Sequence, residues 1–444
     1  MALKLGESNS VTIRACLIGV IVLLLLIPLS MLRGLVSERS GLREQAYTRV
    51  AEGWGGNVVT GGPMLAIPTE RTIVEGNVTR IVRSDIYLLP ARLDAEVEMK
   101  LEPQPRRVGI YAVPVYLANI HLTGSFDFAP LRPLLGKQGT TYLWNQSRLR
   151  LPLAQVRSLR EVQQARFANQ DIKLGPAGPG LYRGVESNID LTDLVKSGDV
   201  SASAGATFNF RTVVAGSRDL SVLPTGSTTN ITLRSDWPHP SFQGAFLPVS
   251  HSISASGFDA RWQVLELNRP YRQAWQESEV DEPTLLESAL GVGLYQSIDV
   301  YQCGERAIKY GLLFIALTFL TFFAWEQSSS IRMHPMQYLL VGLALSMFYL
   351  LLIALSEHIA FMYAYLIAAS ALVLLIGLYL ASVLRSRSRG IVAGAAMTTV
   401  YGLLYVLVLS EDHALLLGAI TLFAALAGVM ISTRKIDWYR QTAP

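Results

Sequence analysis

The sequence predicts a bundle of six membrane-spanning α-helices that carries a large, mostly β domain inserted between the first and second helices. Long apolar runs without charged residues predict the helices, because a helix needs roughly 20 apolar residues to cross a hydrocarbon core of about 30 Å. Residues 33–306 have ordinary polarity and alternate strictly in places, which predicts strands. Charged residues make up 16% of the chain, below the roughly 25% of soluble proteins, as membrane segments require.

The first predicted helix covers residues 15–32, after a short polar segment at residues 1–14. A cleaved signal peptide is the alternative to an uncleaved anchor here. Signal peptides usually have an apolar core of about 7–15 residues followed by a cleavage site of the Ala-x-Ala kind. This run is longer, and it ends in Ser30, Met31, Leu32 and Arg33, so the sequence favours an anchor.

The insert at residues 33–306 is expected to fold mostly into antiparallel strands, with two packed sheets as one arrangement. Residues 93–101 and 258–264 alternate between apolar and charged or polar side chains, and residues 229–233 do so more weakly. An alternation of period two indicates a strand with one buried face. Helices are expected at residues 37–51, 191–196 and 283–290.

Five further membrane helices are predicted in the C-terminal part, before a tail at residues 434–444. They cover residues 307–325, 336–356, 359–384, 390–410 and 413–433. Five such runs in so short a stretch are not expected of a soluble protein. The last four also look like two repeated hairpins that run in the same direction, a parallel repeat that some transporters use.

The charges of the short loops predict the topology. Arg385, Arg387 and Arg389 share one loop, whereas the loops with Glu357 and Glu411 contain no Lys or Arg. Short cytoplasmic loops are enriched in basic residues. Both chain ends are therefore expected in the cytoplasm and the β domain in the periplasm of a bacterium. Basic residues at membrane boundaries argue against a nucleic-acid partner, and the lipid bilayer is the partner that the sequence implies.

One titratable cluster is predicted at the outer ends of the helices: Glu357, His358, Glu411, Asp412 and His413. Imidazoles with carboxylates can hold a zinc-like ion or act as a pH switch. The favoured interpretation is that these polar residues simply end the helices, because their spacing matches no metal motif. No metal or other cofactor is therefore predicted.

Catalysis and proton-coupled transport are both disfavoured. The insert contains no Gly-x-Ser-x-Gly, His-Glu-x-x-His or Ser-x-x-Lys motif, so we predict no catalytic residue and no enzyme. Apart from Lys309 and His413 near their ends, the predicted spans contain no Asp, Glu, Lys, Arg or His, whereas transporters usually place such residues at mid-membrane depth. A transporter or lipid-handling protein built on the repeated hairpins stays the alternative to a binding or scaffolding protein.

Two further sites are predicted from local sequence. Trp237, His239 and Phe242 form an aromatic and proline-rich segment that would serve as a recognition surface or, as we favour, a rigid turn. The joint between the insert and the second helix either orients the domain or marks the membrane boundary. Its candidate residues are Asp299, Tyr301, Glu305, Arg306 and Lys309.

Several stretches together resemble one family, in the same order along nearly the whole chain. They are residues 54–56, 62–63, 67–68, 109–116 (a presumed strand), 233–242, 299–302, 305–314, 355–358 and 435–439. In these stretches the chain is similar to the CreD family. Two positions depart from the family pattern: the resemblance implies a basic or polar residue in place of Cys303 and an aromatic residue in place of His413.

The resemblance implies a bacterial inner-membrane protein that supports cell envelope integrity. It also implies production under a two-component stress response, and a link to colicin tolerance and to the β-lactam response. The resemblance supplies no catalytic residue. The expected partner is an envelope component or another membrane protein.

Overall fold

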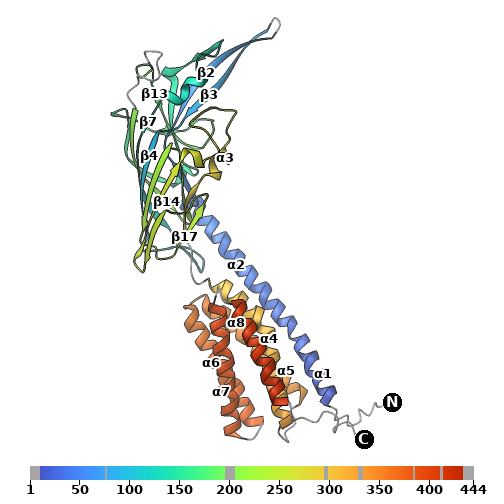
Figure 1. The fold of residues 1–444 in the computed structure, drawn as a ribbon. Coiled ribbons are helices and arrows are strands. Elements are labelled where there is room, and N and C mark those ends of the chain that lie inside the picture. Colours follow the sequence, from blue (N-terminus) through green and yellow to red (C-terminus); the bar gives the residue numbers. More distant parts are fainter. Residues whose placement is uncertain are drawn as a thin grey trace. The chain divides into compact units, whose positions relative to one another are not determined.

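The computed structural model describes residues 11–75, 78–195, 206–294, 299–328, 334–383, 386–410 and 414–433. The chain divides into two compact units. The helical unit contains Met1–Arg43 and Ile298–Pro444, and the β unit contains Glu44–Ser297 (Figure 1). The mostly β character of the insert is thereby confirmed.

The helical unit consists of long apolar helices. They are α1 (Val11–Leu24), α2 (Leu26–Trp54, of which the part to Arg43 belongs here), α4 (Val300–Ser328), α5 (Pro335–Ser356), α6 (Phe361–Val383), α7 (Arg387–Leu409) and α8 (Ala414–Thr433). Pro28 explains the break at Leu25, because proline offers no N–H to the carbonyl of Leu24, four residues earlier. Residues 37–51 are helical within α2, as predicted.

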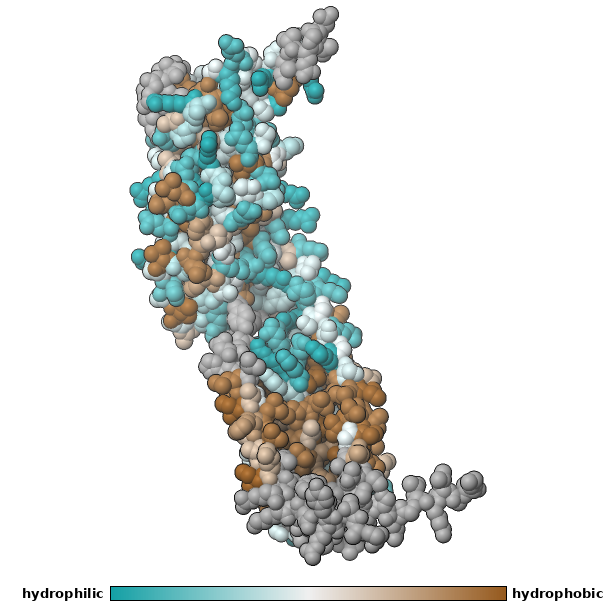
Figure 2. Space-filling view, turned by 45° about the vertical axis from the view of Figure 1, so that its right-hand side comes forward, coloured by the Kyte–Doolittle hydropathy of each residue, from teal (hydrophilic) through white to brown (hydrophobic). Residues whose placement is uncertain are grey.

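Among the described residues, four helices are long and apolar enough to cross a membrane: Cys16–Trp54, Pro335–Ser356, Phe361–Val383 and Gly390–Leu409. Helices α4 and α8 cover the other two predicted runs, but the total of six crossings stays a prediction. Figure 2 shows hydrophobic side chains over the surface of the helical unit and mostly hydrophilic ones over the β unit. Leu378, for example, is 71% exposed, as suits a side chain in contact with lipid.

The larger sheet of the β unit has eight strands in the order β11-β10-β14-β7-β4-β16-β19-β18. Their bounds are β4 (Arg92–Leu101), β7 (Tyr116–Phe126), β10 (Leu159–Phe167), β11 (Gln170–Asp171), β14 (Ala206–Gly216), β16 (Thr228–Ser235), β18 (Ser250–Ser254) and β19 (Gly257–Leu265). The strands predicted at residues 93–101, 229–233 and 258–264 are confirmed as β4, β16 and β19. The predicted antiparallel pairing does not hold for every neighbour, because β16 is antiparallel to β19 but parallel to β4. A long connection separates β4 and β16 in sequence, which parallel neighbours require.

A second sheet has the order β12-β13-β9-β2-β3-β20, with β8 paired to β2. Its strands are β2 (Met64–Glu75), β3 (Val78–Leu88), β8 (Thr140–Tyr142), β9 (Ser147–Pro152), β12 (Gly175–Pro176), β13 (Gly184–Ile189) and β20 (Ala274–Gln276). The main core contains side chains of both large sheets, such as Leu65 and Leu149 with Val97 and Phe210, so the two sheets pack face to face. Alternate residues of the second sheet, such as Ala66 and Tyr87, face away from this core.

Smaller elements complete the β unit. They are a four-stranded sheet of β1 (Val58–Gly61), β15 (Asp219–Leu223), β21 (Leu290–Leu294) and β17 (Pro240–Gly244), a pair β5 (Arg106–Val108) and β6 (Tyr111–Val113), the helix α3 (Glu282–Glu287), and the 3-10 helices η1 (Ala129–Leu134), η2 (Trp144–Gln146), η3 (Val156–Ser158) and η4 (Glu266–Asn268).

Three local predictions need correction. Residues 109–116 are not one strand, because Gly109, at a φ of 60°, begins the turn between β5 and β6. The helix predicted at residues 191–196 is a single turn in its described part, with Leu194 and Val195 both donating to the carbonyl of Leu191. The helix predicted at residues 283–290 is shorter, because α3 ends at Glu287.

Candidate functional site

Asp299 forms the best-defined ion pair of the helical unit. Its carboxylate oxygens accept hydrogen bonds from both terminal nitrogens of Arg43 on α2, at 2.7 and 2.6 Å. Asp299 precedes α4, and its side chain also accepts from the backbone N–H of Tyr301, at 2.9 Å. A carboxylate at this position caps the helix and suits the positive end of the helix dipole. The Asp299 side chain is 10% exposed, so this pair lies largely out of solvent.

Glu357, at the end of α5, belongs to the same part of the helical unit. It accepts a hydrogen bond from the hydroxyl of Tyr301 at 3.2 Å and lies 3.8 Å from Nε of Arg39. Arg39 and Arg43 are four residues apart, so they lie on one face of α2. Tyr301 therefore donates to two acidic residues, through its backbone N–H to Asp299 and through its hydroxyl to Glu357. Each of these carboxylates also lies beside an arginine of α2. We call Arg39, Arg43, Asp299, Tyr301 and Glu357 the helix-end cluster.

The structure brings together part of the predicted joint. Asp299 and Tyr301 belong to the helix-end cluster, whereas Glu305 lies apart, 3.6 Å from Arg33, in a pair that is mostly exposed. Arg306 donates to the carbonyl of Val408 near the end of α7, at 3.4 Å. The side chain of Lys309 is exposed. The arginines of α2 were not predicted as partners, although their four-residue spacing is the signal that points to a shared face.

The structure describes only part of the titratable cluster, for which we favoured helix-ending residues over a metal site. Glu357 is engaged by Tyr301 and Arg39, and His358 is exposed. Glu411, Asp412 and His413 lie outside the described residues. In the part of the chain that the structure describes, no group of three or more His, Cys, Asp or Glu side chains is placed to hold a metal ion.

The segment with Trp237, His239 and Phe242 has internal contacts that a rigid turn would have. The indole N–H of Trp237 donates to the carbonyl of His239 at 2.8 Å, and their rings meet edge to face. Phe242, in β17, packs its ring against His251, Phe258 and Trp262. These aromatic side chains therefore pack largely against other residues of the β unit.

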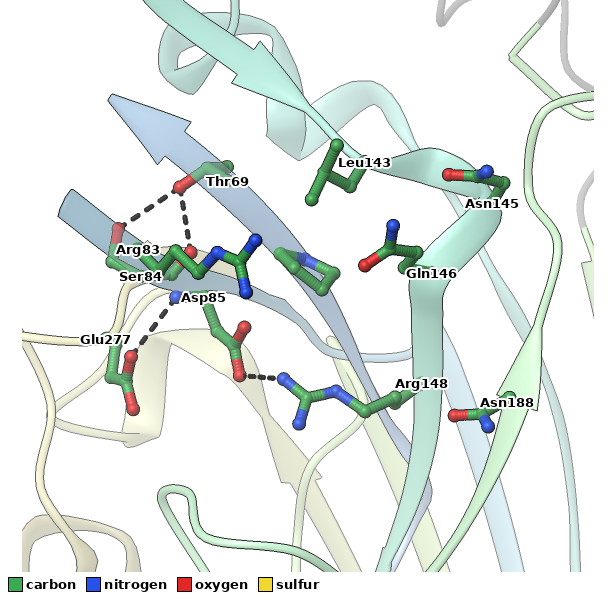
Figure 3. A pocket seen from close by; sticks show the side chains of 11 residues that line it. Thr69, Arg83, Ser84, Asp85, Leu143, Asn145, Gln146, Arg148, Asn188 and Glu277 are labelled. Atoms are coloured by element: carbon green, nitrogen blue, oxygen red, sulfur yellow. Dashed lines mark hydrogen bonds and ion pairs between the residues drawn. The ribbon is translucent and has the colours of Figure 1, made fainter. Parts of the chain in front are cut away.

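A polar pocket of about 560 Å³ lies on the second sheet of the β unit, on the face that points away from the main core (Figure 3). The lining residues come from β2, β3, the η2 segment, β9, β13 and the segment after β20. They are Pro68, Thr69, Arg83, Ser84, Asp85, Leu143, Asn145, Gln146, Arg148, Asn188 and Glu277. Strand alternation explains part of this set, because Ile86 and Leu149 point into the core while Asp85 and Arg148 point outward.

An ion pair forms one wall of the pocket. Nη2 of Arg148 lies 2.5 Å from Oδ2 of Asp85, and the carboxylate of Glu277 accepts from the backbone N–H of Asp85 at 3.1 Å. Thr69 donates its hydroxyl to the carbonyl of Ser84, at 2.8 Å. These bonds hold the side chains in place before any ligand arrives, which lowers the entropic cost of binding.

Burial raises the pKa of the Asp85 carboxyl above its usual value. The nearby guanidinium of Arg148 lowers that pKa, the carboxylate of Glu277 raises it, and Arg150 lowers it by a smaller amount. Arg150 is itself buried, and its Nε donates to Glu186 at 2.9 Å. A buried carboxyl between two arginines and a second carboxylate is an environment more typical of binding sites than of solvated surfaces.

We expect the variant Asp85→Asn to lose stability relative to the wild type when the pH falls. Between the raised folded pKa and the unfolded value of about 3.9, the folded wild type binds a proton that the unfolded chain does not. Protonation therefore favours the folded wild type in this window, whereas asparagine has no such response. The melting temperatures of both proteins at pH 7 and about pH 4.5 would show it. If the difference in melting temperature between the two proteins stays constant with pH, or falls in favour of the variant at low pH, the pKa of Asp85 is not raised.

Sequence analysis did not predict this pocket. Its charged residues occupy outward positions of strands, where polar side chains usually meet solvent. The available signal was weak: Arg83 and Asp85 alternate with the apolar Val82 and Ile86. Only pairing between strands distant in sequence brings Asp85 beside Arg148 and Glu277.

The helices and the pocket together define a class: an integral membrane protein with apolar helices and a folded β domain that contains a polar pocket. The family model for "Inner membrane protein CreD" matches residues 10–439. The chain is 35% identical over 436 residues to inner membrane protein CreD of Escherichia coli (strain K12), covering 95% of this chain and 92% of that protein. The chain therefore belongs to the CreD family, as the resemblance predicts, and is a multi-pass inner-membrane protein.

Among solved structures, two crystal structures of an M1 zinc metallopeptidase from Deinococcus radiodurans, one of them a mutant, show a partial likeness. They are 12% and 11% identical, with TM-scores of 0.22 and 0.23. Each match covers 46% of this chain and 42% of the metallopeptidase, so the chain spans less than half the length of these proteins. Scores this low carry no inference about a zinc site or a peptidase activity here.

Proposed function

We propose that this protein supports the integrity of the bacterial cell envelope by binding an envelope component through its β unit, without catalysing a reaction. The polar pocket around Asp85 and Arg148 carries this proposal, because it combines preformed charge with side-chain amides that can donate and accept hydrogen bonds. Family membership supports the cellular setting. The protein would act in the envelope stress response, and its loss would alter colicin tolerance and the β-lactam response.

The proposal includes six membrane crossings, with both chain ends in the cytoplasm and the β unit in the periplasm. The charge asymmetry of the short loops supports it. An alkaline phosphatase fused at position 150 should be active, because this enzyme needs the periplasm, and the same reporter at Pro444 should be inactive. Inactivity of the first fusion, despite normal amounts of protein, or activity of the second would disprove this topology.

Photo-crosslinking in living cells tests binding at the pocket. A photoreactive phenylalanine analogue in place of Asn145, which is exposed and lines the pocket, should yield a specific adduct with an envelope component. The same analogue at Ser252, exposed on β18 of the other large sheet, serves as the matched control. Adding Arg148→Ala should abolish the adduct at position 145, because this change removes the guanidinium that pairs with Asp85.

Mass spectrometry would identify the adduct. If positions 145 and 252 yield the same products, or if Arg148→Ala leaves the adduct unchanged while the protein stays folded, the pocket is not the binding site.

Transport or lipid handling by the repeated hairpins is the second candidate, and the packing of the helices supports it less. The ring of Phe348 on α5 contacts Tyr365 on α6 and Tyr401 on α7, at centroid distances of 5.5 and 4.7 Å. The hydroxyl of Tyr365 donates to the backbone carbonyl of Tyr401 at 2.6 Å. Aromatic side chains thus fill the space between three helices, where a transport path would need room for its cargo.

A further inference from the structure

The pocket on the second sheet presents both signs of charge to one small space. Asp85 and Glu277 supply carboxylates, and Arg83 and Arg148 supply guanidinium groups. Figure 3 shows Arg83 and Asp85 on one side of this space and Gln146 and Arg148 on the other, with the guanidinium of Arg148 reaching across to Asp85. Two residues of each sign make the lining neutral in sum. A ligand with a single charge would face repulsion from one pair, whereas a ligand with both charges can pair each of them.

Uncharged groups of the lining suit a ligand that both donates and accepts hydrogen bonds. Asn145, Gln146 and Asn188 each offer an amide N–H₂ donor and a carbonyl acceptor. Figure 3 shows these three amides on the same side of the pocket as Arg148, across from Arg83 and Asp85. A peptide bond has the complementary pair of groups, one N–H and one C=O.

The absence of aromatic side chains among the described lining residues argues against a sugar ligand. None of the described residues that line the pocket is aromatic. Tyr142 of β8 and Trp144 of η2 stack on each other and pack against the main core instead. A sugar would gain apolar contact from an aromatic face, while a short peptide needs only the charges and amides that are present.

The size of the pocket limits the length of the ligand. Small-molecule sites usually measure about 300–1,000 Å³, and this one measures about 560 Å³. It therefore suits a ligand of one to a few amino acids and not a long chain.

We propose that this pocket binds a short peptide with a free amine and a free carboxylate, the amine pairing with Asp85 and Glu277 and the carboxylate with Arg83 and Arg148. This inference rests on the proposed function and names the chemistry of its envelope component. Burial raises the pKa of Asp85 although Arg148 pairs with it, and a bound ammonium group would add a second positive charge that favours the ionised carboxylate.

Saturation-transfer NMR on the full chain in detergent micelles provides the test. The probes are alanyl-alanine, its N-acetylated form, its C-terminal amide, and N-acetylglucosamine. Alanyl-alanine should bind, and blocking either end should weaken binding at least about tenfold, the loss expected when one charged partner is removed at a partly exposed site. N-acetylglucosamine should not compete.

Two pocket variants and a control connect this binding to the site. Arg148→Ala should abolish the signal of alanyl-alanine, and Gln146→Glu, at an exposed position, should weaken it by repelling the peptide carboxylate. Arg166→Ala, which breaks an exposed ion pair with Asp171 on the other large sheet, should leave it unchanged. Gln146→Glu keeps the test decisive if Arg148→Ala does not fold.

The outcomes separate this inference from the proposed function. Binding of N-acetylglucosamine that Arg148→Ala abolishes would overturn the peptide while leaving envelope binding intact. Equal binding of the blocked peptides, or no binding of alanyl-alanine to the folded chain, would also overturn the peptide. The proposed function fails separately, when the cellular crosslink at position 145 does not depend on the pocket.

Discussion

Replacing Asp299 with alanine should destabilise the helical unit by about 2–3 kcal/mol. Breaking a buried ion pair costs about 3–5 kcal/mol, and the value is lower here because the Arg43 side chain is 26% exposed. The change also removes the cap of α4, since Asp299 accepts from the backbone N–H of Tyr301. Chemical unfolding of the full chain in detergent, followed by far-ultraviolet circular dichroism, would measure the loss.

Glu305→Ala is the matched control for this prediction. Glu305 also lies on the first turns of α4 and also faces an arginine of α2, Arg33, but both side chains of that pair are more than half exposed. Exposed pairs contribute little because water screens them, so Glu305→Ala should change little. Arg43→Ala should add little to Asp299→Ala, because both changes remove the same interaction. Equal losses for Asp299→Ala and Glu305→Ala would refute the importance of the buried pair.

Trp275→Ala should destabilise the β unit by about 3–5 kcal/mol, the range for removing a large aromatic side chain from a core. Trp275 is 1% exposed, and its ring lies 6.0 Å from that of Tyr87 and 5.9 Å from that of Tyr271. This packing fixes β20 against β3, with Trp275 opposite Tyr87. Near-ultraviolet circular dichroism during thermal unfolding would report the loss of aromatic packing.

The same substitution should affect the pocket, because Glu277 follows β20 directly. The crosslink from position 145 should therefore weaken in Trp275→Ala. Trp275→Phe keeps an aromatic ring and removes an indole N–H that has no hydrogen-bond partner in the described structure. It should therefore lower the free energy of unfolding clearly less than Trp275→Ala does. Leu267→Ala, at a side chain that is 92% exposed, should be neutral. If Trp275→Ala proves as mild as Leu267→Ala, β20 is not held by this packing.

Much of the β unit was predictable, namely the strands that have one buried face and one solvent-exposed face. In β4, Leu93, Ala95 and Val97 are buried, while Glu96 and Glu98 on the other face are exposed, as the alternation predicts. The parallel pairing of β16 with β4 was not predictable in this way. Alternation shows which face of a strand is buried, but it contains no information about which strand lies beside it.

The two candidate sites show the same limit more strongly. Arg43 and Asp299 are 256 positions apart, and Asp85 is separated from Arg148 by 63 positions and from Glu277 by 192. Each of these residues alone looks like an ordinary polar residue at a helix end or on the wet face of a strand. The predicted joint included Asp299 and Tyr301, but not the arginines of α2 that complete the cluster.

By itself, the sequence determined the apolar helices and the β character of the insert, because local hydropathy and the spacing of apolar residues depend on the environment of each segment. The matching stretches along the chain also determined the family. Only the tertiary structure decided which charges meet. Ion pairs and pockets depend on strand register and helix packing between distant segments. A change of one residue in register would turn Asp85 and Arg148 from the outer face of their sheet into the core.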